Sequence, residues 1–286
     1  MDYNKIILRL RSGGKSLDIG KGQTYKLLSK PEGIEGTDYT VDTEKNNQYD
    51  GSKVKNKRIE ERPISLEFEY ERAGINTNER EFIIGFFNPK QTGNLTVDYG
   101  GYKKTIDYEV VSVKDKQENI YGKLSFLVEL TCPDPFFKDI EESSSLIRTW
   151  IGGWEWKFSL PFSLKKRGPQ EAVINNEGHV PTPVQVEFPG PAYYPQVVNK
   201  TTGEFIKVRV TLDVYDVLYI NTDFGKKTVE ISRSGGEKEN AFDLIDLDSD
   251  FFDLEVGENV IEFKVDNAET LNQEVQLSYR NRFVGV

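Results

Sequence analysis

Apolar and polar residues alternate with a period of two along most of the chain. The clearest case is the segment 62–70, in which Ile64, Leu66, Phe68 and Tyr70 share one face. Such alternation is typical of strands with one buried face. Similar patterns predict strands near 5–11, 95–99, 103–113 and 123–131, the first of them turning back at a Gly-Gly pair. Residues 1–138 are therefore expected to form a β-sheet or barrel-like domain.

One segment, near residues 77–88, breaks the alternation. Its apolar residues recur at i, i+1, i+4 and i+5, which places them on one face of a helix. Asn76 is the expected N-cap, and Glu79, three residues later, completes a variant of the capping box. Pro89 should end the helix because the residue before a proline resists α geometry. The chain is thus expected to contain a single helix of about three turns.

The second half, residues 171–286, contains short apolar segments separated by Gly, Asn and Pro. Strands are expected at 182–188, 205–210, 217–221, 227–232, 259–265 and 273–280. Short strands at this regular spacing indicate an antiparallel β-sandwich. Residues 139–170 lie between the halves and are interpreted as a connector that contains Ser-rich and Gly-Gly segments and all three tryptophans, Trp150, Trp154 and Trp156.

A long polar stretch, residues 42–58, is interpreted as an extended surface loop. Loops of this length in a compact domain are often functional. We expect this loop to reach a neighbouring subunit, and its candidate contact residues are Asp42, Tyr49, Lys53, Lys55 and Arg58.

Composition supports a mainly β protein. Val and Ile supply 44 residues and the aromatic residues 34, against five alanines. The net charge of −10 is unevenly placed: residues 1–140 carry −1 and residues 141–286 carry −9. An acidic second half repels polyanions, so nucleic-acid binding is not expected. No signal peptide or membrane-spanning segment is expected, which favours synthesis in the cytosol.

Most catalytic and metal-binding motifs are disfavoured. One His and one Cys cannot build a multi-ligand zinc site or a disulfide framework. The segment Gly13-Gly14-Lys15-Ser16 lacks the first glycine of a P-loop and is interpreted as a hairpin turn. Asp246, Asp248 and Asp250 have the spacing of a calcium loop, but the later positions of that loop do not fit. The single histidine, His179, is interpreted as a surface residue, so neither a cofactor nor a metal is expected.

Several short motifs follow one another in an order that resembles the distal tail proteins, the Dit family, of bacteriophages with long non-contractile tails. The N-terminal motifs are Gly33-Ile34-Glu35-Gly36-Thr37-Asp38-Tyr39, the strand from Arg62, the helix ending in Phe86-Phe87-Asn88-Pro89, and Cys132-Pro133-Asp134-Pro135-Phe136-Phe137. The C-terminal motifs are Ile174-Asn175-Asn176-Glu177-Gly178, Pro181-Thr182-Pro183-Val184, Asn199-Lys200-Thr201-Thr202-Gly203-Glu204, Gly257-Glu258-Asn259-Val260-Ile261 and Tyr279-Arg280-Asn281-Arg282-Phe283-Val284-Gly285-Val286.

The resemblance implies a structural hub of the virion tail tip that is made in the bacterial host cytoplasm. A hexameric ring would be formed by the N-terminal domain, and the C-terminal domain would be a galectin-like sandwich that faces outward. The implied partners are the tail tube protein, the tape-measure protein, and the tail-associated, tail fibre or receptor-binding protein.

Two other functions stay open. A sandwich with exposed aromatic residues could be a carbohydrate-binding, lectin-like protein in which Trp154 and Trp156 stack on sugar rings, although these residues also suit packing of a connector strand. A glycosidase with paired carboxylates is the third hypothesis, because the 47 acidic residues do not reveal their separation in space.

Overall fold

The computed structural model describes residues 5–36, 39–45, 50–148, 150–151, 166–167, 170–266 and 274–286. The chain divides into two compact units. The first comprises Met1–Ile140 together with Phe283–Val286, and the second comprises Glu141–Arg282. The last four residues thus lie with the first unit, whereas the sequence analysis assigned them to the sandwich. The chain passes from one unit to the other twice.

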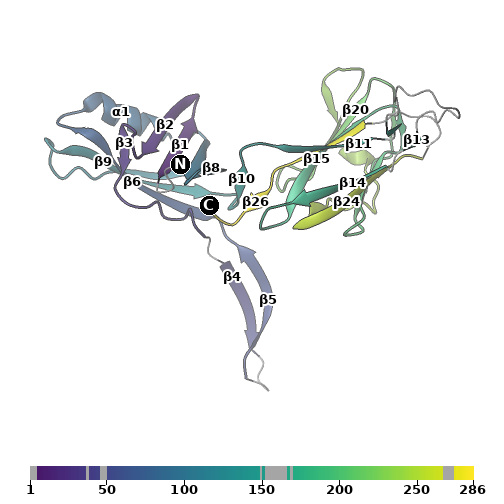
Figure 1. Ribbon diagram of the computed structural model, residues 1–286, viewed down its shortest axis with the longest axis horizontal. Coiled ribbons are helices and arrows are strands. Elements are labelled where there is room, and N and C mark those ends of the chain that lie inside the picture. The colour runs from purple at the N-terminus through teal and green to yellow at the C-terminus, as the bar shows by residue number, and fades with distance from the viewer. Residues whose placement is uncertain are drawn as a thin grey trace, which may run out of the picture. The chain divides into compact units, whose positions relative to one another are not determined.

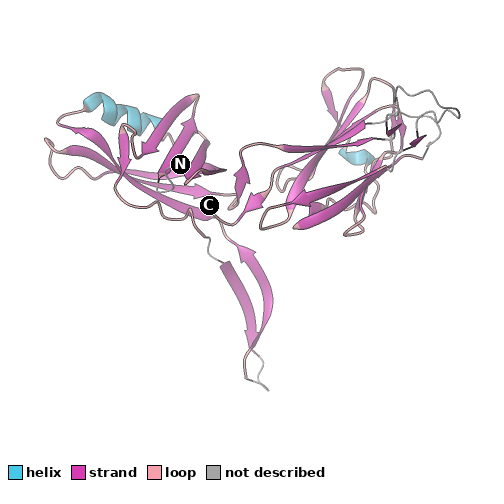
Figure 2. Cartoon of the chain, viewed as in Figure 1, coloured by secondary structure: helices cyan, strands magenta, loops and turns pink. Residues whose placement is uncertain are grey.

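The first unit is a β-barrel. Its strands are β1 (Ile6–Ser12), β2 (Lys15–Gly20), β3 (Tyr25–Leu27), β6 (Arg62–Ala73), β7 (Gly93–Tyr99), β8 (Tyr102–Asp115), β9 (Lys123–Cys132), β10 (Phe137–Asp139) and β26 (Arg282–Phe283). They follow the order β26-β10-β8-β7-β1-β2-β3-β6-β9, and β8 also pairs with β9, which closes the barrel (Figures 1 and 2). The barrel-like domain expected from the alternation is confirmed.

Alternation decides which side chains fill the barrel. Leu66 and Phe68 of β6 are fully buried, and Glu67 between them is partly exposed. Strand β9 repeats this pattern with Phe126 and Val128, and the rings of Phe68 and Phe126 lie 5.7 Å apart. Each fully buried large side chain contributes about 1.5–3 kcal/mol, so the two strands hold the barrel together mainly through these inward positions.

The expected helix is present as α1 (Thr77–Phe86), which buries Ile83 and Phe86. The capping box is not formed, because Asn76 makes no side-chain cap bond and its side-chain Nδ2 donates instead to the carbonyl oxygen of Gly74 at 2.9 Å. The Glu79 carboxylate accepts a hydrogen bond from the hydroxyl of Tyr25. Glu79 therefore binds a tyrosine of the barrel and does not complete the expected capping box.

The second unit is a β-sandwich, as expected. One sheet has the order β11-β25-β15-β20-β21-β22, with β23 beside β15, and the facing sheet has the order β14-β24-β17-β18. The first sheet contains β11 (Ser143–Arg148), β15 (Thr182–Pro189), β20 (Val217–Asn221), β21 (Thr228–Ser232), β22 (Lys238–Asn240), β23 (Asp253–Leu254) and β25 (Glu274–Tyr279). The second contains β14 (Glu171–Asn176), β17 (Gln196–Asn199), β18 (Phe205–Lys207) and β24 (Gly257–Lys264).

Aromatic packing joins the two sheets. The rings of Phe188 on β15 and Phe263 on β24 meet edge to face, with centroids 5.7 Å apart. The unit also contains two short strand pairs, β12 (Trp150–Ile151) with β13 (Lys166–Arg167) and β16 (Ala192–Tyr193) with β19 (Thr211–Leu212), and a 3-10 turn, η1 (Phe242–Leu244). Strand β11 pairs with β25, so the first part of the expected connector is a strand of the sheet. Trp154 and Trp156 lie outside the described residues.

Candidate assembly surfaces

A hairpin stands where the sequence analysis expected a surface loop. Strands β4 (Tyr39–Lys45) and β5 (Ser52–Ile59) pair only with each other among the described residues, and the hairpin extends away from the barrel (Figure 1). The loop interpretation is therefore wrong. Tyr, Thr and Val in β4 suit an extended backbone, and Gly51, with φ of +104°, adopts a turn conformation that other residues avoid. This hairpin is called the arm.

The charged candidates lie along the arm. Asp42 is opposite Asn56, and Lys53 is opposite Glu44. Lys55 lies at a register shift, and its Nζ is 3.3 Å from a Glu44 carboxylate oxygen. Ion pairs this exposed contribute at most about 1 kcal/mol, so they leave the charges available to a partner.

Two further candidates complete this set. Arg58 donates through Nε to the Glu60 carboxylate at 2.9 Å. Tyr49 lies outside the described residues. The structure thus brings Asp42, Lys53, Lys55 and Arg58 onto one exposed hairpin.

The arm also has an apolar face that the sequence analysis missed. The register places Tyr39 opposite Ile59 and puts Val41 and Val54 on the same face, which also carries Lys57 opposite Val41 and Thr43 opposite Val54. The exposed fractions are 58% for Tyr39, 46% for Val41 and 45% for Val54. The four apolar residues, Tyr39, Val41, Val54 and Ile59, are called the arm stripe. An isolated hairpin is marginally stable in water, so the stripe favours a partner that covers it.

A buried arginine fixes the root of the arm. Arg62 is 1% exposed, and its Nη1 donates to the carbonyl oxygens of Gly33 and Gly36 at 2.6 and 2.7 Å. Its Nε donates to the carbonyl oxygen of Pro135 at 2.7 Å, and Nη2 donates to that of Val284. Burial lowers the pKa of this guanidinium, but an arginine keeps its charge in proteins. The cluster of these groups is called the Arg62 cradle.

The C-terminal tail is held at the same place. The amide of Val286 donates to the carbonyl oxygen of Ile34 at 2.9 Å. A Cβ on Gly285 would lie 1.5 Å from the carbonyl oxygen of Glu35, so only glycine fits. Three of the motifs that carry the family resemblance, around residues 33–39, 132–137 and 279–286, therefore converge on one buried cation.

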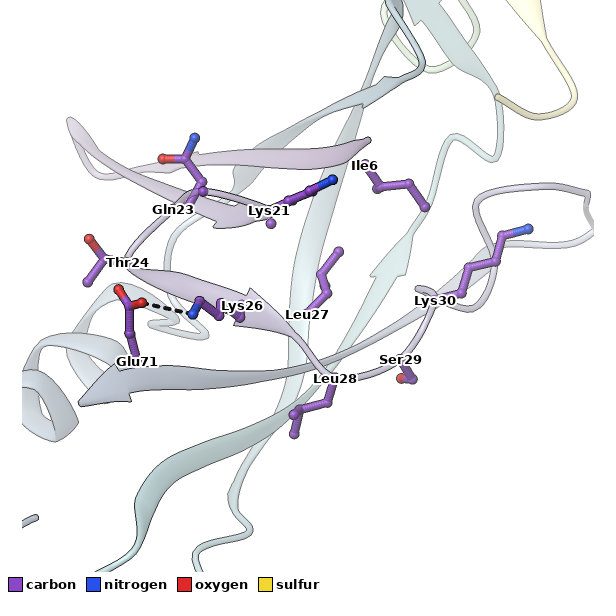
Figure 3. Close-up of a pocket in the computed structure, with 12 residues that line it drawn as sticks. Ile6, Lys21, Gln23, Thr24, Lys26, Leu27, Leu28, Ser29, Lys30 and Glu71 are labelled. Atoms are coloured by element: carbon purple, nitrogen blue, oxygen red, sulfur yellow. Dashed lines mark hydrogen bonds and ion pairs between the residues drawn. The ribbon is translucent and has the colours of Figure 1, made fainter. Parts of the chain in front are cut away.

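A hollow of about 860 Å³ opens beside β3 in the first unit (Figure 3). Its lining includes Lys21, Lys26, Leu28 and Glu71, and Nζ of Lys26 lies 2.8 Å from a Glu71 carboxylate oxygen. Both partners of that ion pair are largely exposed. A hollow lined by mutually paired surface charges does not provide the buried, convergent polar groups that a small-molecule site needs.

The chemically reactive candidates are dispersed. His179 lies exposed in a turn, and its backbone amide donates to the carbonyl oxygen of Arg282 at 2.8 Å. Burial raises the pKa of the Cys132 thiol to about 12, which keeps it protonated near neutral pH. Asp246 of the calcium-like spacing accepts a hydrogen bond from Arg209 at 2.8 Å. Within the described ranges, no three His, Cys, Asp or Glu residues are grouped so as to hold a metal ion.

No helix in the described part of the chain is long and apolar enough to cross a membrane.

Comparison with known proteins agrees with this architecture. Residues 177–283 match the family model for the C-terminal domain of siphovirus-type tail components. The crystal structure of the SPP1 Dit protein, a paradigm of the hub adsorption apparatus in phages that infect Gram-positive bacteria, has a TM-score of 0.69 at 11% identity. That match covers 96% of this chain and 99% of the SPP1 chain. No curated protein sequence matches the chain.

Two baseplate structures show the same fold. A chain of the phage P2 baseplate in its activated conformation with Ca has a TM-score of 0.55 at 13% identity, and the phage p2 baseplate in its activated conformation with Sr has 0.56 at 14%. Each match covers 98% of this chain and 99% of the other. Residues 177–283 therefore resemble the C-terminal domain of siphovirus-type tail components, and the resemblance of the chain to the distal tail proteins of the Dit family is confirmed.

Proposed function

We propose that this protein is a structural hub of the tail tip of a siphovirus or prophage. Copies of the chain form a hexameric ring that joins the tail tube to the tail-associated or receptor-binding apparatus. The fold shared with the SPP1 Dit protein over nearly the whole chain is the observation that carries this proposal.

The arm supports an assembly of several copies. Its exposed stripe and its charged residues Asp42, Lys53, Lys55 and Arg58 suit a heterologous contact in which each subunit reaches the next. Tyr49 belongs to the same proposed contact. Residues 1–140 are nearly neutral, so their copies can pack with little repulsion, whereas the −9 of residues 141–286 favours sandwiches that face outward.

The proposed partners are the tail tube protein, the tape-measure protein and a tail fibre or receptor-binding protein. The protein acts without catalysis, cofactor or metal, is made in the host cytoplasm and ends in the virion tail tip. The first unit, residues 1–140 with 283–286, forms the ring, and the second unit, residues 141–282, forms the outward, galectin-like domain. Support for a structural role comes from the dispersal of the reactive groups and from the tail and baseplate relatives.

Light scattering and negative-stain imaging of the purified full chain test this proposal. We expect a hexamer with rings visible in the images. A chain that stays monomeric up to about 100 μM would overturn the ring, since the dissociation constant of a stable assembly lies far below that concentration.

A further inference from the structure

Two exposed phenylalanines and one half-buried phenylalanine lie at or near the turn between β20 and β21 of the second unit. Phe224, in the turn between β20 and β21, is 90% exposed, and Phe242, in η1, is 45% exposed. Phe251 lies beside Phe242, with parallel rings whose centroids are 5.7 Å apart. These three residues are called the phenylalanine patch.

The patch is held in place by local structure. Nζ of Lys227 lies 5.2 Å from the centroid of the Phe251 ring, which ties the β20–β21 turn to the aromatic pair. The turn itself is closed by a hydrogen bond from the Lys226 amide to the Asp223 carbonyl oxygen at 2.9 Å. Phe224 thus lies on a short, hydrogen-bonded turn. Because this turn is already ordered, less conformational entropy is lost when a partner binds.

The fold does not need the ring of Phe224. Phe251 packs partly against the sandwich core, but Phe224 is outside that cluster. Large exposed aromatic residues on a rigid turn can anchor protein interfaces, where a few side chains, often aromatic ones, supply most of the binding free energy. The position therefore indicates a surface that another molecule covers.

Acidic residues near the patch outnumber the two lysines of its turn, Lys226 and Lys227. Asp223, Asp243 and Asp250 each adjoin one of the three phenylalanines in the chain, and Asp253 lies close enough to Lys227 and Asp223 to feel both charges. Between Glu237 and Glu258 there are nine acidic residues and one lysine. An apolar centre with an acidic rim repels an acidic surface and attracts a basic one.

We propose that the phenylalanine patch and its acidic rim form a docking site for a different protein of the tail, whose contact surface is basic and offers an apolar pocket or side chain to Phe224. A second sandwich is a poor occupant, because this half of the chain carries −9 and like charges would face each other. The inference rests on the proposed function for the nature of the partner, and its test does not depend on ring formation.

The test measures binding of labelled synthetic peptides to the full chain by fluorescence anisotropy. One panel alternates Arg or Lys with Leu or Trp, and a matched panel carries Glu in place of the cations. We expect the basic panel to bind, the acidic panel not to bind, and Phe224→Ala to weaken basic binding by about tenfold. Added salt should also weaken binding of the basic panel, because salt screens the exposed charges of the rim.

Tyr215→Ala is the matched control. Tyr215 is 76% exposed and lies before β20, at the end of that strand away from Phe224, so its variant should bind as the wild type does. Failure of the basic panel to bind, or equal binding to Phe224→Ala and the wild type, would overturn the docking site. A change of oligomeric state in Phe224→Ala would also overturn it, because a second copy would then be the occupant. A ring without peptide binding leaves the proposed function intact.

Discussion

The guanidinium of Arg62 donates a hydrogen bond to the carbonyl oxygen of Val284, 222 positions further along the chain. The same side chain binds the carbonyl oxygens of Gly33 and Gly36, which precede the arm, and Arg62 itself follows the arm in sequence. One buried cation therefore fixes both the root of the arm and the C-terminal tail. A charge this deep is tolerated only because backbone oxygens replace its lost water.

Arg62→Met tests the Arg62 cradle. The thioether keeps apolar contact with Phe137, whose ring lies 5.0 Å from the guanidinium carbon, but it donates no hydrogen bonds. Four carbonyl oxygens lose their charged donor, so we expect the free energy of unfolding of the first unit to fall by about 3 kcal/mol. Urea denaturation gives the value. Arg72→Met, at the exposed end of the same strand, is the control and should change it by less than about 0.5 kcal/mol. Similar losses in both variants would contradict the role given to the cradle.

Gly285→Ala should displace the tail. The added methyl group meets the backbone oxygen of Glu35, which cannot move aside without shifting the root of the arm. Hydrogen exchange is then expected to speed up at the Val286 amide, whose acceptor is the Ile34 carbonyl oxygen. Gly36→Ala is the control in the same region, because nothing lies within 4 Å of its added Cβ. Unchanged exchange in Gly285→Ala would show that the tail adapts.

The sequence predicted the fold better than it predicted the assembly surfaces. The barrel, the helix and the sandwich follow from local periodicity, as the alternation of β6 shows. The strands of the arm were missed because Asp42, Lys53 and Lys55 make the segment read as polar, and the few apolar residues of the arm stripe do not give a sustained period of two. The Arg62 cradle could not be predicted from the sequence, because its carbonyl acceptors lie up to 222 positions from Arg62 along the chain. The motifs were visible, but their meeting point is a property of the folded chain.

Alkaline pH should destabilise the first unit. Burial raises the pKa of Cys132 from 9.0 to about 12, so the thiol ionises in the unfolded chain before it ionises in the folded one. This contribution is fully present below pH 9 and is lost as the pH rises towards 12. Tyr25 and Tyr108 have pKa values raised in the same direction by burial and add to the loss above pH 10.

Cys132→Ala isolates the thiol. The variant is less stable at every pH because of the cavity it leaves, but between pH 9 and 10 its stability should fall less steeply than that of the wild type. Urea midpoints across this range give both slopes. Because the chain has one cysteine, thiol labelling of the wild type should also be slow until the first unit opens. Rapid labelling of the folded protein would show that Cys132 is accessible.

Substitutions in the arm stripe should impair assembly without affecting the folding of the barrel. Val41→Lys with Val54→Lys puts two charges on the face proposed to meet a neighbour. Burying these charges in a subunit contact costs more free energy than exposed ion pairs on the arm can contribute. We expect the concentration needed for ring formation, measured by light scattering, to rise at least about tenfold. Thermal unfolding of the barrel should stay unchanged, since β4 and β5 pair only with each other among the described strands.

Val214→Lys supplies the comparison for the arm. Val214 is an equally apolar residue, 62% exposed, in the turn before β20 of the second unit, and its variant should assemble as the wild type does. Loss of assembly in both variants would mean that added positive charge, and not the stripe, is responsible. Normal rings from the doubly substituted arm would place the subunit contact elsewhere on the first unit and leave the stripe to a different partner. Since the charges of Lys53 and Arg58 are retained in the double variant, a selective loss assigns the contact to the apolar face.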